Sequence, residues 1–151
     1  DYGALANGGK LMQPYVVDRI RKPDGAEVVT QPKEVRAVIS TQTSATISAM
    51  LVRVVQNGHG KRAGVPGYFV AGKTGTAQIP DPATGTYMKD LTIGTFAGFA
   101  PVEDPQFVMV VQLIKPRDVQ FAESSAAPLF GNLAKFLMLY LHIPPTTATK
   151  P

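Results

Sequence analysis

The stretch 71–78 concentrates the residue types that could do chemistry. It reads Ala-Gly-Lys-Thr-Gly-Thr-Ala-Gln, so Lys73 supplies an ammonium group, and Thr74 and Thr76 supply hydroxyl groups. An ammonium attracts a ligand carboxylate, and short hydroxyls donate hydrogen bonds to it. Glycine weakens a strand, so Gly75 indicates that a ligand approaches the backbone closely and pairs with its N–H and C=O groups. The stretch therefore predicts a strand edge that binds a carboxylate-bearing peptide or a similar molecule.

The Lys-Thr-Gly tripeptide has two other interpretations. It occurs often by chance, so an ordinary strand with an exposed lysine also fits the tripeptide alone. Residues 67–74, Gly-Tyr-Phe-Val-Ala-Gly-Lys-Thr, formally match a phosphate-binding loop. Such a loop must follow a strand and open a helix, so that backbone N–H groups point at the phosphates. Here 68–70 is itself strand-like and 75–77 opens no helix, so the context disfavours nucleotide binding.

The remaining reactive residue types give weaker candidates. The chain has no cysteine, which excludes a thiol nucleophile, a thiolate metal site and a disulfide framework. His59, between glycines, is interpreted as a solvated loop residue, and His142 is expected only to help the end of an apolar helix electrostatically. We expect neither a metal nor another cofactor, because the acidic residues lack metal-ligand spacing: Asp81, Asp90, Glu103, Asp104 and Glu123.

Composition sets the class of molecule that must position these residues. With 151 residues, 44% of them hydrophobic and 17% charged, the chain can form one domain or a large piece of one. Its formal net charge of +4 suits an acidic partner. The basic residues form no clustered stripe, so we do not expect a nucleic-acid partner. No run of 18 apolar residues occurs, so any membrane anchor is expected outside this sequence.

The first third of the chain predicts a helix end, a hairpin and an amphipathic helix. Residues 2–9 are typical of a helix that stops at Gly8-Gly9. The turn 22–25, Lys-Pro-Asp-Gly, predicts a β-hairpin between 15–21 and 26–31. Ser40 or Thr41 is expected to cap a helix that Asn57-Gly58 ends, with its apolar positions at helical spacing: Ile47, Leu51, Val54 and Val55.

The rest of the chain predicts three strands and a last helix. The strand-like runs are 68–79, 92–100 and 107–115, and the short link between the last two favours an antiparallel pair. Residues 108–111 are apolar at every position, which predicts a central strand covered on both faces. Ser124 or Ser125 is expected to cap a helix whose buried stripe is Leu129, Leu133, Phe136, Leu137 and Tyr140. The fold class is therefore α/β, with an antiparallel sheet flanked by helices.

Several blocks in a fixed order resemble the class B penicillin-binding proteins. These blocks are 60–68, 71–78, 96–101, 126–130 and 143–145, together with Ala6-Asn7-Gly8-Gly9 and Pro14. The resemblance runs over residues 1–145 and implies the carboxy-terminal portion of a β-lactamase/transpeptidase-like domain. Residues 146–151 are expected to form a flexible tail. Several ordered blocks are far more specific than one tripeptide.

The resemblance also implies roles for the residues of the strand 73–76. Lys73 would set the electrostatics around a nucleophilic serine and a proton-relay serine, and Thr74 and Thr76 would bind the carboxylate of a peptide or β-lactam. The backbone N–H of Thr76 would be one of two oxyanion-hole donors, which usually supply the largest electrostatic term in acyl transfer. Pleat alternation separates Lys73 from Thr74, so an edge twist or a bulge would have to reconcile them.

The family's nucleophile motif, S-x-x-K, and its S-x-N motif are absent from this sequence. None of the five serines has lysine three residues on or asparagine two residues on: Ser40, Ser44, Ser48, Ser124 and Ser125. By resemblance, both motifs lie upstream, and the parent would be a membrane-anchored serine D,D-transpeptidase in the cell envelope, facing the cell wall. Its partners would be stem peptides ending in D-Ala-D-Ala, β-lactams and the upstream part of the same domain. A noncatalytic β-lactam or peptidoglycan sensor is the alternative, and the upstream sequence would distinguish the two.

Overall fold

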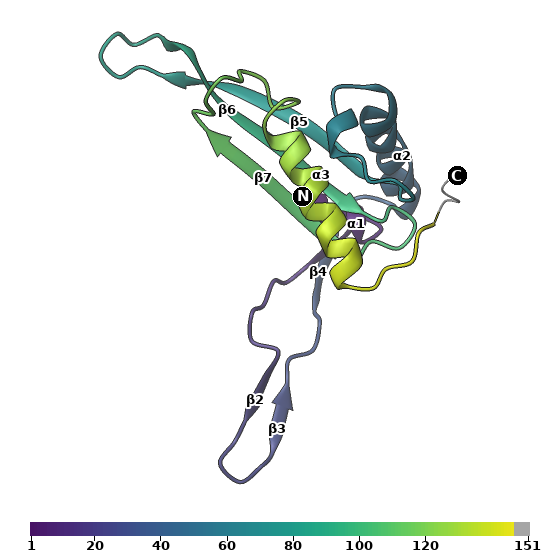
Figure 1. The fold of residues 1–151 in the computed structure, drawn as a ribbon. Helices are drawn as coiled ribbons and strands as arrows, with labels where there is room; N and C mark the ends of the chain where they lie inside the picture. Colours follow the sequence, from purple (N-terminus) through teal and green to yellow (C-terminus); the bar gives the residue numbers. More distant parts are fainter. Residues whose placement is uncertain (147–151) are drawn as a thin grey trace.

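The computed structural model describes residues 1–146, which form helices around a long antiparallel sheet (Figure 1). The helices are α1 (Tyr2–Ala6), α2 (Thr41–Asn57) and α3 (Ala126–Tyr140), with a 3-10 turn, η1 (Lys61–Ala63). The short strands of the first part are β1 (Lys10–Met12), β2 (Arg19–Arg21), β3 (Glu27–Val29) and β4 (Glu34–Ala37). The long strands are β5 (Ala71–Pro80), β6 (Tyr87–Ala100) and β7 (Phe107–Ile114).

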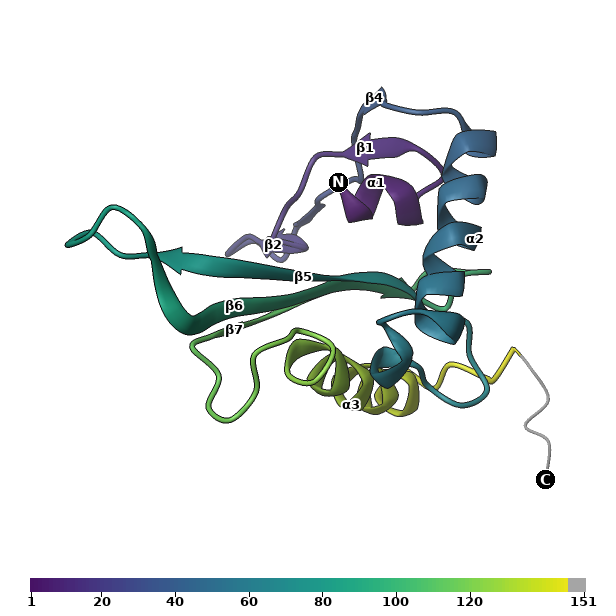
Figure 2. The same ribbon diagram turned by 90° about the horizontal axis from the view of Figure 1, so that it is seen from above.

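The sheet has the order β5-β6-β7, with both pairs antiparallel, and the short link between β6 and β7 predicted the second pair. Its register is regular from Ala71↔Phe99 to Gln78↔Thr92, and a shift follows only between Gln78 and Pro80. Figure 2 shows the sheet between two layers: α3 lies against one face, and α1 with β1 and β4 lies on the other side. The predicted α/β class and antiparallel sheet are confirmed.

The predicted strand 107–115 is confirmed as β7, but within residues 1–146 it is an edge strand and not the predicted central one. The central strand is β6, and β7 pairs only with β6 among the described residues. Its exposure alternates: Val111 is buried against α3, whereas Val108 and Val110 are 41% and 60% exposed on the opposite face. The apolar run therefore has one face covered by the described residues and one face open to solvent.

Helix α3 lies where the sequence predicts it, but the stripe of residues predicted to be buried is wrong. The side chains packed in the core lie on another face of the helix, and three of the five are alanines: Ala126, Ala127, Phe130, Ala134 and Met138. Leu133, Phe136 and Tyr140 are 40%, 60% and 69% exposed. Close packing explains the choice, because a Cβ on Gly131 would lie 2.6 Å from the carbonyl oxygen of Arg62. Small residues let α3 approach η1 and the sheet closely, while Phe130 and Met138 fill the core between them.

The buried face of the sheet is built around two phenylalanines. Phe96 of β6 and Phe130 of α3 are fully buried, and their ring centroids lie 4.6 Å apart. Glycines of β5 and β6 make room for these rings, since a Cβ on Gly72 would lie 2.5 Å from the Phe96 ring. A Cβ on Gly98 would lie 3.1 Å from the Phe130 ring. Each buried aromatic ring contributes about 1.5–3 kcal/mol through removal of its surface from water, so this pair anchors α3 to the sheet.

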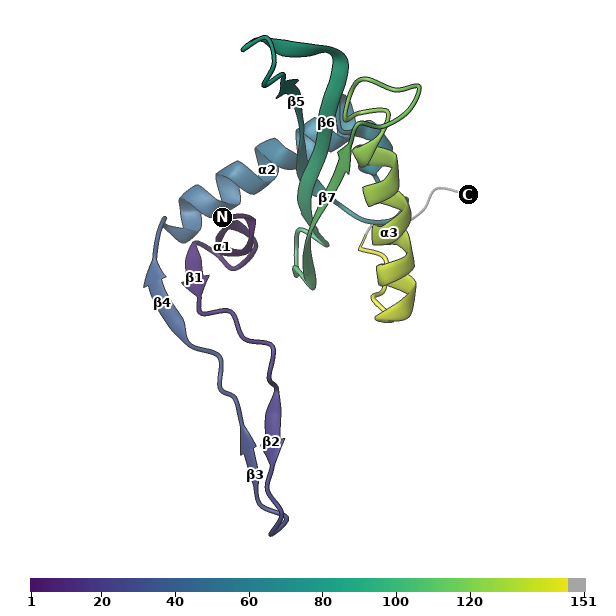
Figure 3. The same ribbon diagram turned by 90° about the vertical axis from the view of Figure 1, so that its left-hand side faces the viewer.

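The predicted helix 41–57 and the predicted hairpin are confirmed. Ser40 caps α2 by accepting a hydrogen bond from the N–H of Thr43, at 3.1 Å. The hairpin strands β2 and β3 pair antiparallel around the turn 22–25, where Gly25 has a φ of +84°. Figure 3 shows this hairpin projecting away from the sheet and helices. Its strands are shorter than predicted, because 15–18 leave the ladder.

The predicted flexible tail, 146–151, lies outside the described residues except for Thr146. The N–H of Thr146 donates to the carbonyl oxygen of Gly67, at 3.0 Å. Within residues 1–146, no helix is both long and apolar enough to span a bilayer.

Candidate functional site

The regular pleat of β5 separates the predicted site residues onto two faces. Thr74 and Thr76 lie on the face that α3 covers, because Thr76 Oγ1 accepts a hydrogen bond from the N–H of Ala122, in the loop before α3, at 3.1 Å. Lys73 and Gly75 alternate to the opposite face. Lys73 nevertheless curls round the open edge of β5: its Nζ donates to the Thr74 carbonyl at 3.0 Å and lies 3.3 Å from Thr74 Oγ1. A flexible stem, without a bulge, therefore brings the ammonium to the hydroxyl.

The same contact shows which backbone groups of β5 point outward. The Thr74 carbonyl reaches Lys73 Nζ at the edge that carries no partner strand in the described residues. In an antiparallel pair, the N–H and C=O of one residue point to the same side, and residues two apart share that side. The N–H of Thr76 therefore points to the open edge, beside the Lys73 ammonium. An edge of this kind offers hydrogen bonds, a positive charge and hydroxyls to one ligand.

The two glycines of this stretch have different reasons to be glycine. A Cβ on Gly72 would lie 2.5 Å from Cε1 of the buried Phe96, so internal packing requires it. A Cβ on Gly75 would meet nothing closer than Thr95 Cβ at 4.0 Å. Packing therefore explains Gly72, whereas Gly75 leaves free space beside an exposed backbone. The sequence alone could not separate these two cases.

A hollow of about 340 Å³ adjoins the threonine face of this strand. It is lined by Thr74, Thr76, Phe121, His59 and Glu123. His59 lies in an exposed loop, as predicted, but the sequence did not reveal that its Nδ1 lies 2.6 Å from Glu123 Oε2. Because a carboxylate only accepts hydrogen bonds, the imidazole Nδ1–H donates in this pair. These two residues are 64 positions apart in the chain, so no local pattern could have indicated their contact.

The loop before α3 forms a fixed wall of this hollow. Besides the bond from Ala122 to Thr76, the Thr92 hydroxyl donates to the Gln120 carbonyl at 2.7 Å, and Ser125 Oγ donates to the Phe121 carbonyl at 3.1 Å. Ser125 was a predicted helix cap, and it occupies the N-cap position without a side-chain cap bond. The accepted bond also orients the Thr76 hydroxyl, since its own proton must point away from the Ala122 N–H.

The other predicted histidine, His142, lies directly after α3, as expected. Its Nδ1 is 3.1 Å from the carbonyl oxygens of Leu139 and Tyr140, at the carboxyl end of the helix. Within residues 1–146, no three His, Asp or Glu residues lie together in a way that could hold a metal ion.

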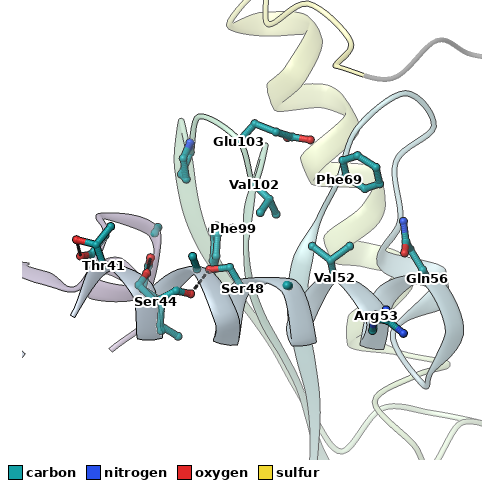
Figure 4. Close-up of a pocket in the computed structure, with 16 residues that line it drawn as sticks. Thr41, Ser44, Ser48, Val52, Arg53, Gln56, Phe69, Phe99, Val102 and Glu103 are labelled. Atoms are coloured by element: carbon teal, nitrogen blue, oxygen red, sulfur yellow. Dashed lines mark hydrogen bonds between the residues drawn. The ribbon is translucent and has the colours of Figure 1, made fainter. Parts of the chain in front are cut away.

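A larger cavity, of about 570 Å³, lies elsewhere, between α2, α1 and the end of β6 (Figure 4). Its two buried serines have their hydroxyls committed to backbone carbonyls: Ser44 Oγ donates to Leu5 at 2.7 Å, and Ser48 Oγ to Ser44 at 2.8 Å. Within residues 1–146, neither hydroxyl contacts a histidine or lysine that could act as its base. The cavity's walls are largely apolar, with Phe99 and Val102 among them. This cavity therefore fits a packing partner better than a reaction.

Residues 2–135 match the family model described as the penicillin-binding protein transpeptidase domain. The chain belongs to the penicillin-binding protein transpeptidase family. The resemblance predicted from the ordered blocks of residues is therefore confirmed. Lys73–Thr76 and the hollow beside them lie inside the matched region.

Curated relatives of this transpeptidase-family chain match almost all of it. Penicillin-binding protein PbpB of Mycobacterium tuberculosis is 41% identical over 153 residues, which cover 95% of this chain and 22% of the relative. Stage V sporulation protein D of Bacillus subtilis is 38% identical over 146 residues, covering 94% of this chain and 22% of the relative. The chain thus spans about a fifth of the length of these relatives.

Solved structures share the fold. A crystal structure of penicillin-binding protein 3 of Mycobacterium tuberculosis complexed with ampicillin aligns with a TM-score of 0.85 at 38% identity, covering 99% of this chain and 35% of that one. The apo transpeptidase domain of Burkholderia pseudomallei penicillin-binding protein 3 aligns with a TM-score of 0.77 at 29% identity. The alignment covers 97% of this chain and 42% of that domain's chain. The chain therefore has the fold of part of a penicillin-binding transpeptidase domain.

Proposed function

We propose that this chain forms one wall of the active site of a serine D,D-transpeptidase that cross-links peptidoglycan. The observation that carries the proposal is the open edge of β5. There the Lys73 ammonium, the Thr76 N–H and the Thr74 hydroxyl converge, in a chain of the penicillin-binding family. Ampicillin and aztreonam complexes of a relative support β-lactam binding at this class of domain.

Each group at this edge would act on a different part of the substrate. The reaction is acylation of a serine by the penultimate D-Ala of a stem peptide, release of the last D-Ala, and transfer of the acyl group to an amine. The Thr76 N–H would stabilise the oxyanion that forms on the attacked carbonyl. Thr74 and Thr76 hydroxyls would hold the terminal carboxylate, and Lys73 would add positive charge beside the nucleophile.

The nucleophile would come from an upstream part of the same domain, since no serine of this chain carries the family motif. The surfaces left open by the described residues support such a partner. Val108 and Val110 are exposed on the face of the sheet to which Lys73 and Gly75 alternate. Exposed Phe136 and Tyr140 stack on α3, with their rings 5.8 Å apart. Apolar patches of this kind mark surfaces that another element covers.

We place the parent protein in the cell envelope, anchored in the membrane with this domain on the extracytoplasmic side, where its substrate is found. The relatives named as penicillin-binding and sporulation proteins of bacteria support that location. Stem peptides ending in D-Ala-D-Ala would be the substrates, and β-lactams would acylate the same serine.

Covalent labelling with a fluorescent penicillin tests the proposal. The full-length protein is expected to form a stable adduct, and this chain alone is expected to form none. An unlabelled full-length protein, under conditions where PbpB-type relatives are labelled, would refute the proposed activity. Labelling of the isolated chain would show that the nucleophile lies within it.

A further inference from the structure

The hollow beside Thr74 and Thr76 already contains a carboxylate of the protein itself. Glu123 lines this hollow with the two threonines, and its Oε2 accepts a hydrogen bond from His59 at 2.6 Å. A carboxylate, a histidine donor and two threonine hydroxyls therefore meet at one place. The histidine N–H and the threonine hydroxyls are the donors that a bound ligand carboxylate would require, and the Glu123 carboxylate occupies the place of such a ligand.

The surroundings of Glu123 are positively charged. A second hollow, of about 320 Å³, shares His59 and Glu123 with the first and is also lined by Lys61 and Arg62. Glu123 is the single acidic residue among those that line the two hollows in the described part of the chain. When its side chain turns away, the charged groups that remain are the cations Lys61 and Arg62, which favour an incoming anion.

Glu123 can leave His59 without disturbing the loop that carries it. The loop is held to the sheet by the Ala122 N–H on Thr76 and by Thr92 on Gln120. The side chains of His59 and Glu123 are 82% and 42% exposed, so their pair faces water. Exposed ion pairs are weak, and the side-chain rotation of an exposed glutamate is fast.

We propose that His59 is a carboxylate-binding residue of this site and that Glu123 is an internal competitor for it. Resting on the proposed function, the inference assigns the terminal carboxylate of the D-Ala-D-Ala ligand to His59 together with the threonine hydroxyls. The ligand carboxylate displaces that of Glu123 and accepts the same Nδ1–H bond. A purely structural role for the pair, as a latch on the loop, makes the opposite prediction for Glu123.

The test is calorimetric binding of N-acetyl-D-alanyl-D-alanine to the full-length protein, which does not require acylation. Glu123→Gln removes the competing charge and is expected to lower the dissociation constant of the dipeptide by about two- to fivefold. His59→Ala is expected to weaken it about tenfold, because a hydrogen bond to a charged group is lost. His59→Gln keeps an N–H donor and is expected to retain most of the affinity. As a control, the affinity of the same dipeptide with a carboxy-terminal amide should be unchanged by either substitution.

Two results would overturn the proposal. Weaker dipeptide binding by Glu123→Gln, at an unchanged unfolding temperature, would show that the pair is a structural latch. Equal affinities of wild type, His59→Ala and His59→Gln would remove His59 from the site. The proposed function fails separately: a full-length protein that binds the dipeptide with these responses, but forms no penicillin adduct, has the carboxylate site without the transpeptidase reaction.

Discussion

Lys73 and Thr74 leave β5 on opposite faces, yet Lys73 Nζ lies 3.0 Å from the Thr74 carbonyl and 3.3 Å from its hydroxyl. The lysine stem passes round the open edge of the sheet to make both contacts. The positive charge is therefore located at the strand edge, beside the outward N–H of Thr76, and not over one face. Both contacts leave Lys73 exposed and free to reorient toward a ligand.

Replacing Lys73 by methionine in the full-length protein tests the charge at this edge. Methionine keeps an unbranched apolar stem and removes the ammonium, so acylation by a β-lactam is expected to slow by about a hundredfold or more. Because Lys73 is exposed, the unfolding temperature should remain close to that of wild type. Stopped-flow acylation kinetics provide the measurement, and an unchanged rate constant would remove Lys73 from the mechanism.

Thr76 offers a prediction about stability as well as binding. Its Oγ1 accepts the N–H of Ala122, a residue that is fully buried. Thr76→Ala leaves that N–H without its partner and is expected to cost about 1–3 kcal/mol of unfolding free energy. Thr76→Ser keeps the hydroxyl and should cost less. Urea unfolding of both variants decides the matter, since equal losses would mean that the hydrogen bond contributes nothing.

Gly75 is predicted to matter for ligands and little for folding. A Cβ at this position meets nothing closer than 4.0 Å, so Gly75→Ala should leave the unfolding temperature nearly unchanged. The added methyl group projects from a backbone that a ligand approaches, so β-lactam acylation should slow about tenfold or more. A variant that acylates at the wild-type rate would show that no ligand lies against Gly75.

Gly94 is a control for Gly75, because an added Cβ there is expected to affect folding. A Cβ on Gly94 would lie 2.6 Å from Ser125 Oγ and 3.3 Å from Ala122 Cα, so it would push the loop before α3 off the sheet. Gly94→Ala is expected to destabilise the protein by about 1–3 kcal/mol. Thermal unfolding compares it directly with Gly75→Ala, and a similar melting temperature for the two variants would contradict the packing described for this loop.

The elements whose signals are local could be predicted from the sequence. Ser40 at the start of α2 and the Pro23-Asp24-Gly25 turn act within a few residues, and both appear as expected. The antiparallel pairing of β6 and β7 was predicted from the short link between them and is confirmed. Such signals report the preferences of the backbone, which distant residues seldom override.

The errors concern which apolar face is covered. The bulky stripe of α3 and the alternate valines of β7 are exposed in the described residues. The sequence could not predict this, because hydrophobicity indicates that a face packs against something but does not identify the element that covers it. The choice of Ala134 and Gly131 over Leu133 depends on the close approach of η1, which is a tertiary contact. The His59–Glu123 contact, across 64 positions, was invisible for the same reason.

Mapping the penicillin adduct on the full-length protein by mass spectrometry tests the central claim most directly. If the β5 edge is one wall of a serine acyl-transfer site, the acyl group will be found on a single serine outside the sequence of this chain. The Lys73→Met variant will carry the same adduct, formed far more slowly. An adduct on any residue of this chain, or no adduct at all, would contradict the account.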